Sequence, residues 1–116
     1  MKTESTVYIL SKQFALRIIK LYKFLTEEKH EYIMSKQIYR SGTSIGANFE
    51  ESKFASSRAD YLNKMRIALK EANETLYWLE LLRESDYIKS KEFDSLSNDL
   101  KTIIGTTVNI INKVKE

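Results

Sequence analysis

The sequence predicts an all-α protein, a single domain over residues 1–116 built as an antiparallel, up-down-up-down four-helix bundle. Three observations support this fold class. Apolar residues recur at spacings of three and four along most of the chain, which is the period of one helix face. The chain has no proline and three glycines, so little in it interrupts a helix. Its 116 residues suffice for one core without disulfides, and it contains no cysteine.

Residues 6–28 are predicted to form the first helix, because their apolar side chains share one face. These apolar positions are Val7, Leu10, Phe14, Ile18, Leu21 and Leu25. Lys12, Lys20 and Lys23 fall within an arc of about 80° on the opposite side of the helical wheel. Together with Arg17, these lysines are the candidate nucleic-acid-binding residues. The alternative is an ordinary solvated face, because the exterior of a bundle is usually charged.

The charged junction at residues 27–31 contains the single histidine of the chain, His30. Glu27 and His30 spell Glu-x-x-His, which supplies metal ligands in carboxylate-bridged bundles. Such a site needs two copies of the motif and a glutamate from each of two further helices. One copy in a polar run therefore predicts a surface histidine, and we expect no metal and no other cofactor.

The second predicted helix, residues 35–54, is rich in small residues. Gly42 and Gly46 are one turn apart and predict a groove in which another helix can approach closely. A phosphate-binding loop is the competing interpretation, but the segment lacks a Gly-Lys-Ser or Gly-Lys-Thr ending and a preceding strand.

A polar row on the same helix consists of Arg40, Ser44, Asn48 and Glu51, spaced by four, four and three residues. Such a row is either a solvent face or an internal hydrogen-bonded network. The surrounding small residues favour a network between helices or subunits, because buried polar groups have to be paired.

The third predicted helix, residues 57–84, carries the longest apolar pattern. Its main seam is Leu62, Met65, Leu69, Ala72, Leu76 and Leu79, and further apolar surface comes from Tyr61, Ile67, Ala68, Trp78, Leu81 and Leu82. This face is wider than one core contact requires, which predicts a subunit interface. Glu71 and Glu74 resemble paired catalytic carboxylates, but no histidine is near and basic residues are abundant, so ion pairing is the preferred interpretation.

The fourth predicted helix covers residues 90–115 and again keeps the spacing of three and four.

Lysines interrupt the apolar residues near the N-terminus, so the N-terminal segment does not fit a signal peptide or a membrane span. We therefore expect a cytoplasmic protein that has no membrane partner. The formal net charge of +3 permits nucleic acid as a partner without requiring it.

Two motifs occur in order along the middle of the chain. They are Arg40-Ser-Gly-Thr-Ser44-Ile-Gly-Ala-Asn48-Phe-Glu-Glu51 and Ile67-Ala-Leu-Lys-Glu71-Ala-Asn-Glu74-Thr-Leu-Tyr77-Trp78-Leu79. Together they resemble the bacterial four-helix-bundle proteins encoded in 23S rRNA intervening sequences, which are often labelled ribosomal. The chain is also similar to the accessory variability determinant of diversity-generating retroelements. That resemblance implies a homopentameric barrel with basic surfaces that binds nucleic acid and a reverse transcriptase.

The residues and the resemblance together lead to one functional hypothesis. We expect a non-enzymatic, homo-oligomeric scaffold, a pentamer by resemblance, that associates with RNA or DNA. A reverse transcriptase is an expected partner if the gene belongs to a retroelement. The alternative is a protein-binding adaptor with no role in nucleic-acid binding, and an enzyme is disfavoured because no reaction centre is recognisable.

Overall fold

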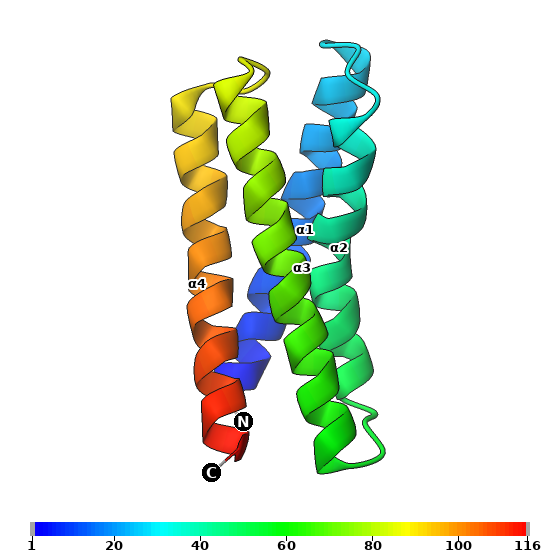
Figure 1. The fold of residues 1–116 in the computed structure, drawn as a ribbon, viewed down its shortest axis with the longest axis vertical. Helices are drawn as coiled ribbons and strands as arrows, with labels where there is room; N and C mark the ends of the chain where they lie inside the picture. Colours follow the sequence, from blue (N-terminus) through cyan, green and yellow to red (C-terminus); the bar gives the residue numbers. More distant parts are fainter. Residues whose placement is uncertain (1, 116) are drawn as a thin grey trace.

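A computed structural model describes residues 2–115, with side chains from residue 5 onward, and confirms the prediction of four helices. The helices are α1 (Lys2–Glu27), α2 (Met34–Ser52), α3 (Arg58–Glu84) and α4 (Ser90–Lys115), and the described residues contain no strand. Neighbouring helices run in opposite directions, and both ends of the chain lie at the same end of the bundle (Figure 1). The molecule is elongated, with extents of 45 × 22 × 19 Å.

The helix boundaries agree with the predictions for α4 and differ slightly elsewhere. Helix α1 begins at Lys2, four residues before its predicted start, because residues 2–5 contain neither glycine nor proline to prevent helix formation. It ends one residue early, at Glu27. Helix α2 is shifted to Met34–Ser52, because the chain tightens after Ser52 into a turn in which the Phe54 N–H bonds the Glu51 carbonyl at 3.0 Å.

Helix α3 begins one residue after its predicted start, because Ser57 is the capping residue outside the helix. The Ser57 hydroxyl oxygen accepts a hydrogen bond from the Asp60 N–H at 3.0 Å. The Asp60 carboxylate in turn accepts the N–H of Ser56 at 3.1 Å. These two bonds satisfy backbone donors that a helix start otherwise leaves unpaired.

Helix α2 starts on a carboxylate cap that the sequence patterns did not reveal. The Glu31 side chain accepts the backbone N–H groups of Ile33, Met34 and Ser35 at 3.2, 3.1 and 2.7 Å. The Ser35 hydroxyl donates back to the Glu31 carbonyl at 2.8 Å. Glu31 is 8% exposed, so its negative charge lies almost enclosed against the positive end of the helix dipole.

Helix α3 has a wide apolar face because it packs against both α2 and α4. Its fully buried residues are Met65, Ala68, Ala72, Thr75, Leu79 and Leu82. They combine positions from the predicted seam with neighbouring positions, while Leu62, Leu69 and Leu76 are half-buried at the edge. Two helices of the same chain thus account for the buried part of this face, and the subunit interface inferred from its width stays a prediction.

The predicted glycine groove on α2 is occupied by α1 of the same chain. A Cβ atom placed on Gly42 would lie 2.8 Å from Ile18 Cγ1, and one placed on Gly46 would lie 3.4 Å from the Ser11 hydroxyl oxygen. Both α1 residues are buried. The small residues of α2 thus allow two helices of one protomer to approach closely, so the groove no longer supports an interface between subunits.

Candidate nucleic-acid interface

The outer face of α1 carries a mixed basic and apolar strip. It consists of Ile9, Lys12, Leu16, Lys20 and Lys23, spaced by three, four, four and three residues, and we call it the α1 strip. Each residue of the strip is exposed, including Ile9 at 60% and Leu16 at 55%. The predicted orientation of the three lysines away from the core is therefore confirmed.

Helix α1 is the most strongly basic helix of the chain. Within Lys2–Glu27 the sequence has five basic and two acidic residues, an excess equal to the formal net charge of +3 for the whole protein. No ion pair joins Lys12, Lys20 or Lys23 to another residue between positions 5 and 115. Their charges therefore face solvent without an ion-pair partner among these residues, as an electrostatic binding surface requires.

Arg17 lies in a different environment from these lysines. Its guanidinium group donates to the Asp99 carboxylate at 2.8 Å and to the Ser95 hydroxyl at 2.8 Å, both on α4. The side chain is 32% exposed. Arg17 thus connects α1 to α4, and its charge is already compensated within the protomer.

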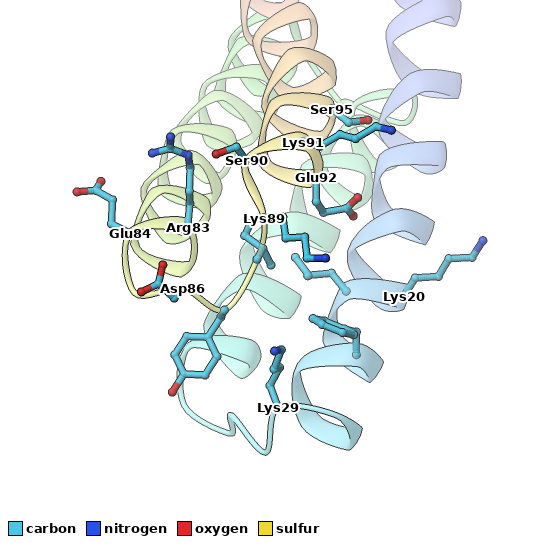
Figure 2. Close-up of a pocket in the computed structure, with 14 residues that line it drawn as sticks. Lys20, Lys29, Arg83, Glu84, Asp86, Lys89, Ser90, Lys91, Glu92 and Ser95 are labelled. Atoms are coloured by element: carbon cyan, nitrogen blue, oxygen red, sulfur yellow. The ribbon is translucent and has the colours of Figure 1, made fainter.

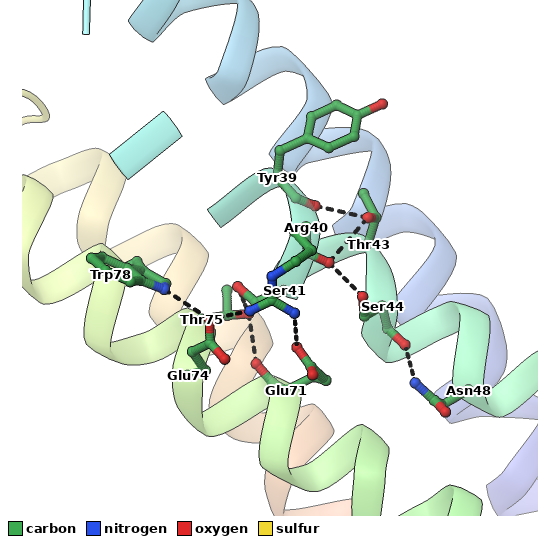
Figure 3. Close-up of polar contacts among 10 residues, drawn as sticks. All are labelled: Tyr39, Arg40, Ser41, Thr43, Ser44, Asn48, Glu71, Glu74, Thr75 and Trp78. Atoms are coloured by element: carbon green, nitrogen blue, oxygen red, sulfur yellow. Dashed lines mark hydrogen bonds and ion pairs between the residues drawn. The ribbon is translucent and has the colours of Figure 1, made fainter. Parts of the chain in front are cut away.

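A second group of predicted residues forms a polar cluster between α2 and α3 (Figure 3). The Arg40 guanidinium reaches across from α2 and forms ion pairs with Glu71, at 3.1 Å, and with Glu74. The indole N–H of Trp78 donates to the same Glu74 carboxylate at 3.0 Å. The prediction that both glutamates are used for ion pairing is confirmed, and the four side chains fix the register of α2 against α3.

The cluster also changes the acidity of its members. The hydrogen bond from Trp78, together with Arg40, lowers the pKa of the Glu74 carboxyl below the ordinary glutamate value. Hydrogen bonding to Glu74 raises the pKa of Arg40. About half of the Arg40 side chain is exposed, so solvent screens the pair and its contribution to stability is small.

We expect the Glu74→Gln substitution to reduce stability at neutral pH more than in acid. Because the folded-state pKa of Glu74 is lowered, its stabilising contribution is complete above the ordinary glutamate pKa and is lost as the pH falls through the lowered value. Denaturant unfolding at about pH 7 and about pH 3 measures the difference, with Trp78, the only tryptophan, as the fluorescent reporter. Glu80→Gln, an exposed position on the same helix, is the control. Equal effects of the two variants at neutral pH would contradict the prediction.

The predicted network along Arg40, Ser44, Asn48 and Glu51 does not form as a buried row within the protomer. Ser44 and Asn48 bond to backbone carbonyls of their own helix, those of Arg40 and Ser44, at 2.5 and 2.8 Å. Glu51 is exposed and pairs with Lys64 of α3 at 3.2 Å. Only the two ends of the row reach α3, because the positions between them satisfy their polar groups locally.

The buried polar contact between α2 and α3 is instead a pair of hydroxyl groups. Ser41 and Thr75 are hydrogen bonded at 2.9 Å, and Thr75 also donates to the Glu71 carbonyl at 2.7 Å. Both residues are fully buried. The sequence contained a signal for this pair, because Ser41 falls at helical spacing between Ile38 and Ile45 on the core face.

The remaining sequence candidates lie on the surface. Glu27 and His30 are exposed, and His30 Nδ1 lies 3.1 Å from the Tyr32 hydroxyl oxygen. Among the side chains described, those of residues 5–115, no three histidine, cysteine, aspartate or glutamate residues are grouped as metal ligands. In the same range, every helix is too short or too polar to cross a membrane.

The fold and the exposed basic helix place this chain among compact all-α four-helix-bundle proteins. It belongs to the family of 23S rRNA-intervening sequence proteins, whose model matches residues 3–109. A similar solved structure is that of a protein with unknown function from the S23 ribosomal protein family of Bacteroides thetaiotaomicron. The two chains are 53% identical, the match covers 95% of this chain and 98% of the other, and the TM-score is 0.94. No curated protein matches the chain.

Proposed function

We propose that the protein is a non-enzymatic, homo-oligomeric scaffold of the cytoplasm that binds RNA or DNA through the α1 strip. The observation that carries this proposal is the set of three exposed lysines, Lys12, Lys20 and Lys23, on the most basic helix of the chain. Phosphate contacts by lysine release counterions from the nucleic acid and give affinity with little sequence preference. Arg17 belongs to the structural contact with α4 rather than to this surface.

Oligomerisation is part of the proposal because three lysines give one protomer only weak affinity. A ring repeats the strip on every subunit, so that one strand meets many cations and gains avidity without new contacts. The resemblance to the accessory variability determinant, which implies a homopentamer, supports a ring of five subunits. Light scattering coupled to size exclusion tests this step. A species of 13.6 kDa at micromolar concentration is a monomer and would refute the ring.

Charge reversal of the strip tests the binding function directly. We expect Lys12, Lys20 and Lys23 changed together to glutamate to abolish binding of a labelled RNA of about 20 nucleotides at about 50 mM salt. Fluorescence anisotropy measures the affinity. For the unchanged protein, the affinity should fall at least tenfold, on the order of the counterion effect, between about 50 and 200 mM salt.

A matched triple variant controls for net charge. Lys70, Lys101 and Lys113 are exposed on α3 and α4, and their reversal changes the net charge by the same amount. We expect this control to weaken binding far less than reversal of the strip. Equal losses in the two variants would show that only overall charge matters, and no binding of RNA or DNA by the unchanged protein would refute the proposed function.

The second candidate function is a protein-binding adaptor, and one observation favours it. Ile9 and Leu16 alternate with the lysines along the same strip, which resembles the mixed surface of a protein interface. A reverse transcriptase is the partner to test when the gene lies in a retroelement. Co-purification that survives nuclease treatment and is lost in an Ile9→Asp, Leu16→Asp variant supports the adaptor.

A further inference from the structure

A large open cleft lies between two loops at one end of the bundle (Figure 2). One wall is formed by the C-terminal half of α1 and the loop after it. The other wall is formed by the end of α3, the following loop and the start of α4. The cleft has a volume of about 1150 Å³, larger than a pocket for one small ligand.

The cleft has an apolar floor and an aromatic ring on each wall. Leu21 and Ile88 are buried beneath it, with exposed fractions of 5% and 7%. Phe24 of α1 is 40% exposed, and Tyr87 of the opposite wall is half-buried. Aromatic rings accessible from a cleft offer faces on which a planar group can stack.

The rim of the cleft is positively charged. Its basic residues are Lys20, Lys29, Arg83, Lys89 and Lys91, against the acidic residues Glu84, Asp86 and Glu92. None of these five cations forms an ion pair with another residue between positions 5 and 115. The Lys29 ammonium lies 5.8 Å from the centre of the Phe24 ring, so a charge and an aromatic face are presented together.

The cleft is continuous with the α1 strip through a shared residue. Lys20 belongs to the strip and also lines the cleft, and its side chain extends outward from α1, away from the opposite wall (Figure 2). Lys91, from the start of α4, points toward α1 from the opposite wall (Figure 2). A polyanion following the strip thus arrives at a pocket that combines cations with aromatic surface.

We infer that the cleft binds unpaired nucleotides of a single-stranded RNA or DNA, with bases against Phe24 and Tyr87 and phosphates against Lys29, Lys89 and Lys91. This inference rests on the proposed function and adds a preference to it. A duplex keeps its bases stacked inside the helix and presents only phosphates to the strip, whereas a single strand places bases in the cleft. The positive rim also attracts an acidic peptide, but such a peptide has no bases to stack on the two rings, so the stacking contact is the feature to test.

The test compares a single strand with a duplex of equal phosphate number, at the same salt concentration. We expect the unchanged protein to bind the single strand about tenfold more tightly, the effect of roughly one stacked base. Phe24→Ala and Tyr87→Ala should each remove most of this preference and leave the affinity for duplex unchanged. Tyr77→Ala, an exposed aromatic residue on α3 outside the cleft, should change neither affinity.

A stacking signal separates a direct contact from a structural effect. A 2-aminopurine base in the single strand should lose fluorescence on binding to the unchanged protein and to Tyr87→Phe, but not to Tyr87→Ala. If Tyr87→Ala fails to fold, Phe24→Ala and a triple reversal of Lys29, Lys89 and Lys91 decide the outcome. Equal affinity for single strand and duplex, unaffected by these variants, overturns the inference while the proposed function stands. Binding of neither overturns both.

Discussion

Replacing Gly42 by leucine is expected to remove about 3 kcal/mol or more of the free energy of unfolding. Even the first added carbon has no room, since a Cβ atom would lie 2.8 and 2.9 Å from the two γ-carbons of Ile18. Ile18 is fully buried and β-branched, so its side chain has few alternative rotamers. Thermal unfolding followed by circular dichroism measures the loss.

Alanine substitutions at Gly42 and Gly105 are expected to change the stability in opposite directions. Gly42→Ala should still destabilise the protein, because the clash outweighs the gain of about 1 kcal/mol in helix propensity. Gly105→Ala should stabilise it by about 0.5 to 1 kcal/mol, because nothing lies within 4 Å of the added carbon. A stabilising Gly42→Ala would contradict the close contact between α1 and α2.

At Gly46 the expected effect depends on the size of the new side chain. Gly46→Leu should disrupt the contact with Ser11, whereas the Cβ atom of Gly46→Ala fits at 3.4 Å from the Ser11 hydroxyl oxygen.

The second large effect is expected at Glu31. Glu31→Ala leaves the N–H groups of Ile33, Met34 and Ser35 without their acceptor at the start of α2. We expect a loss of about 2 to 3 kcal/mol, the sum of a lost helix cap and a lost favourable charge at the helix dipole. Urea unfolding monitored by Trp78 fluorescence measures it.

Glu28→Ala is the matched control for Glu31, because Glu28 lies in the same loop and is exposed. Its substitution should change stability by less than about 0.5 kcal/mol. The loss of stability in Glu31→Gln should lie between those of Glu31→Ala and Glu28→Ala, since an amide oxygen still accepts hydrogen bonds but lacks the negative charge. Equal stability of Glu31→Ala and Glu28→Ala would show that water replaces the cap at no cost.

The periodic pattern of apolar residues was sufficient to predict the helices, and least reliable at their ends. Helix α4 matches its predicted range, because its apolar spacing continues from end to end. Helix α2 begins at Met34 and is capped by Glu31 of the preceding loop, a residue type that usually marks a solvated junction in a sequence. Its capping role depends on the backbone path of the loop, which spacing alone does not specify.

The candidate site was predictable where it depends on one helix and not where it depends on the packing of several. The outward direction of Lys12, Lys20 and Lys23 follows from α1 alone. The partner of Arg17 is Asp99, 82 residues away, and nothing in the sequence identifies that pair. The cleft likewise arises because the loop after α1 and the loop after α3 stand apart, a feature of the assembled bundle.

The position of the chain ends has a practical consequence for engineering this protein. Both ends lie at the end of the bundle opposite the loops that form the cleft (Figure 1). A short flexible linker can therefore join them, and new termini can be opened in the turn around Ala55, as in circular permutation. A fluorescent domain fused at either terminus would likewise project away from the cleft, which makes energy transfer to a labelled strand a measure of binding orientation.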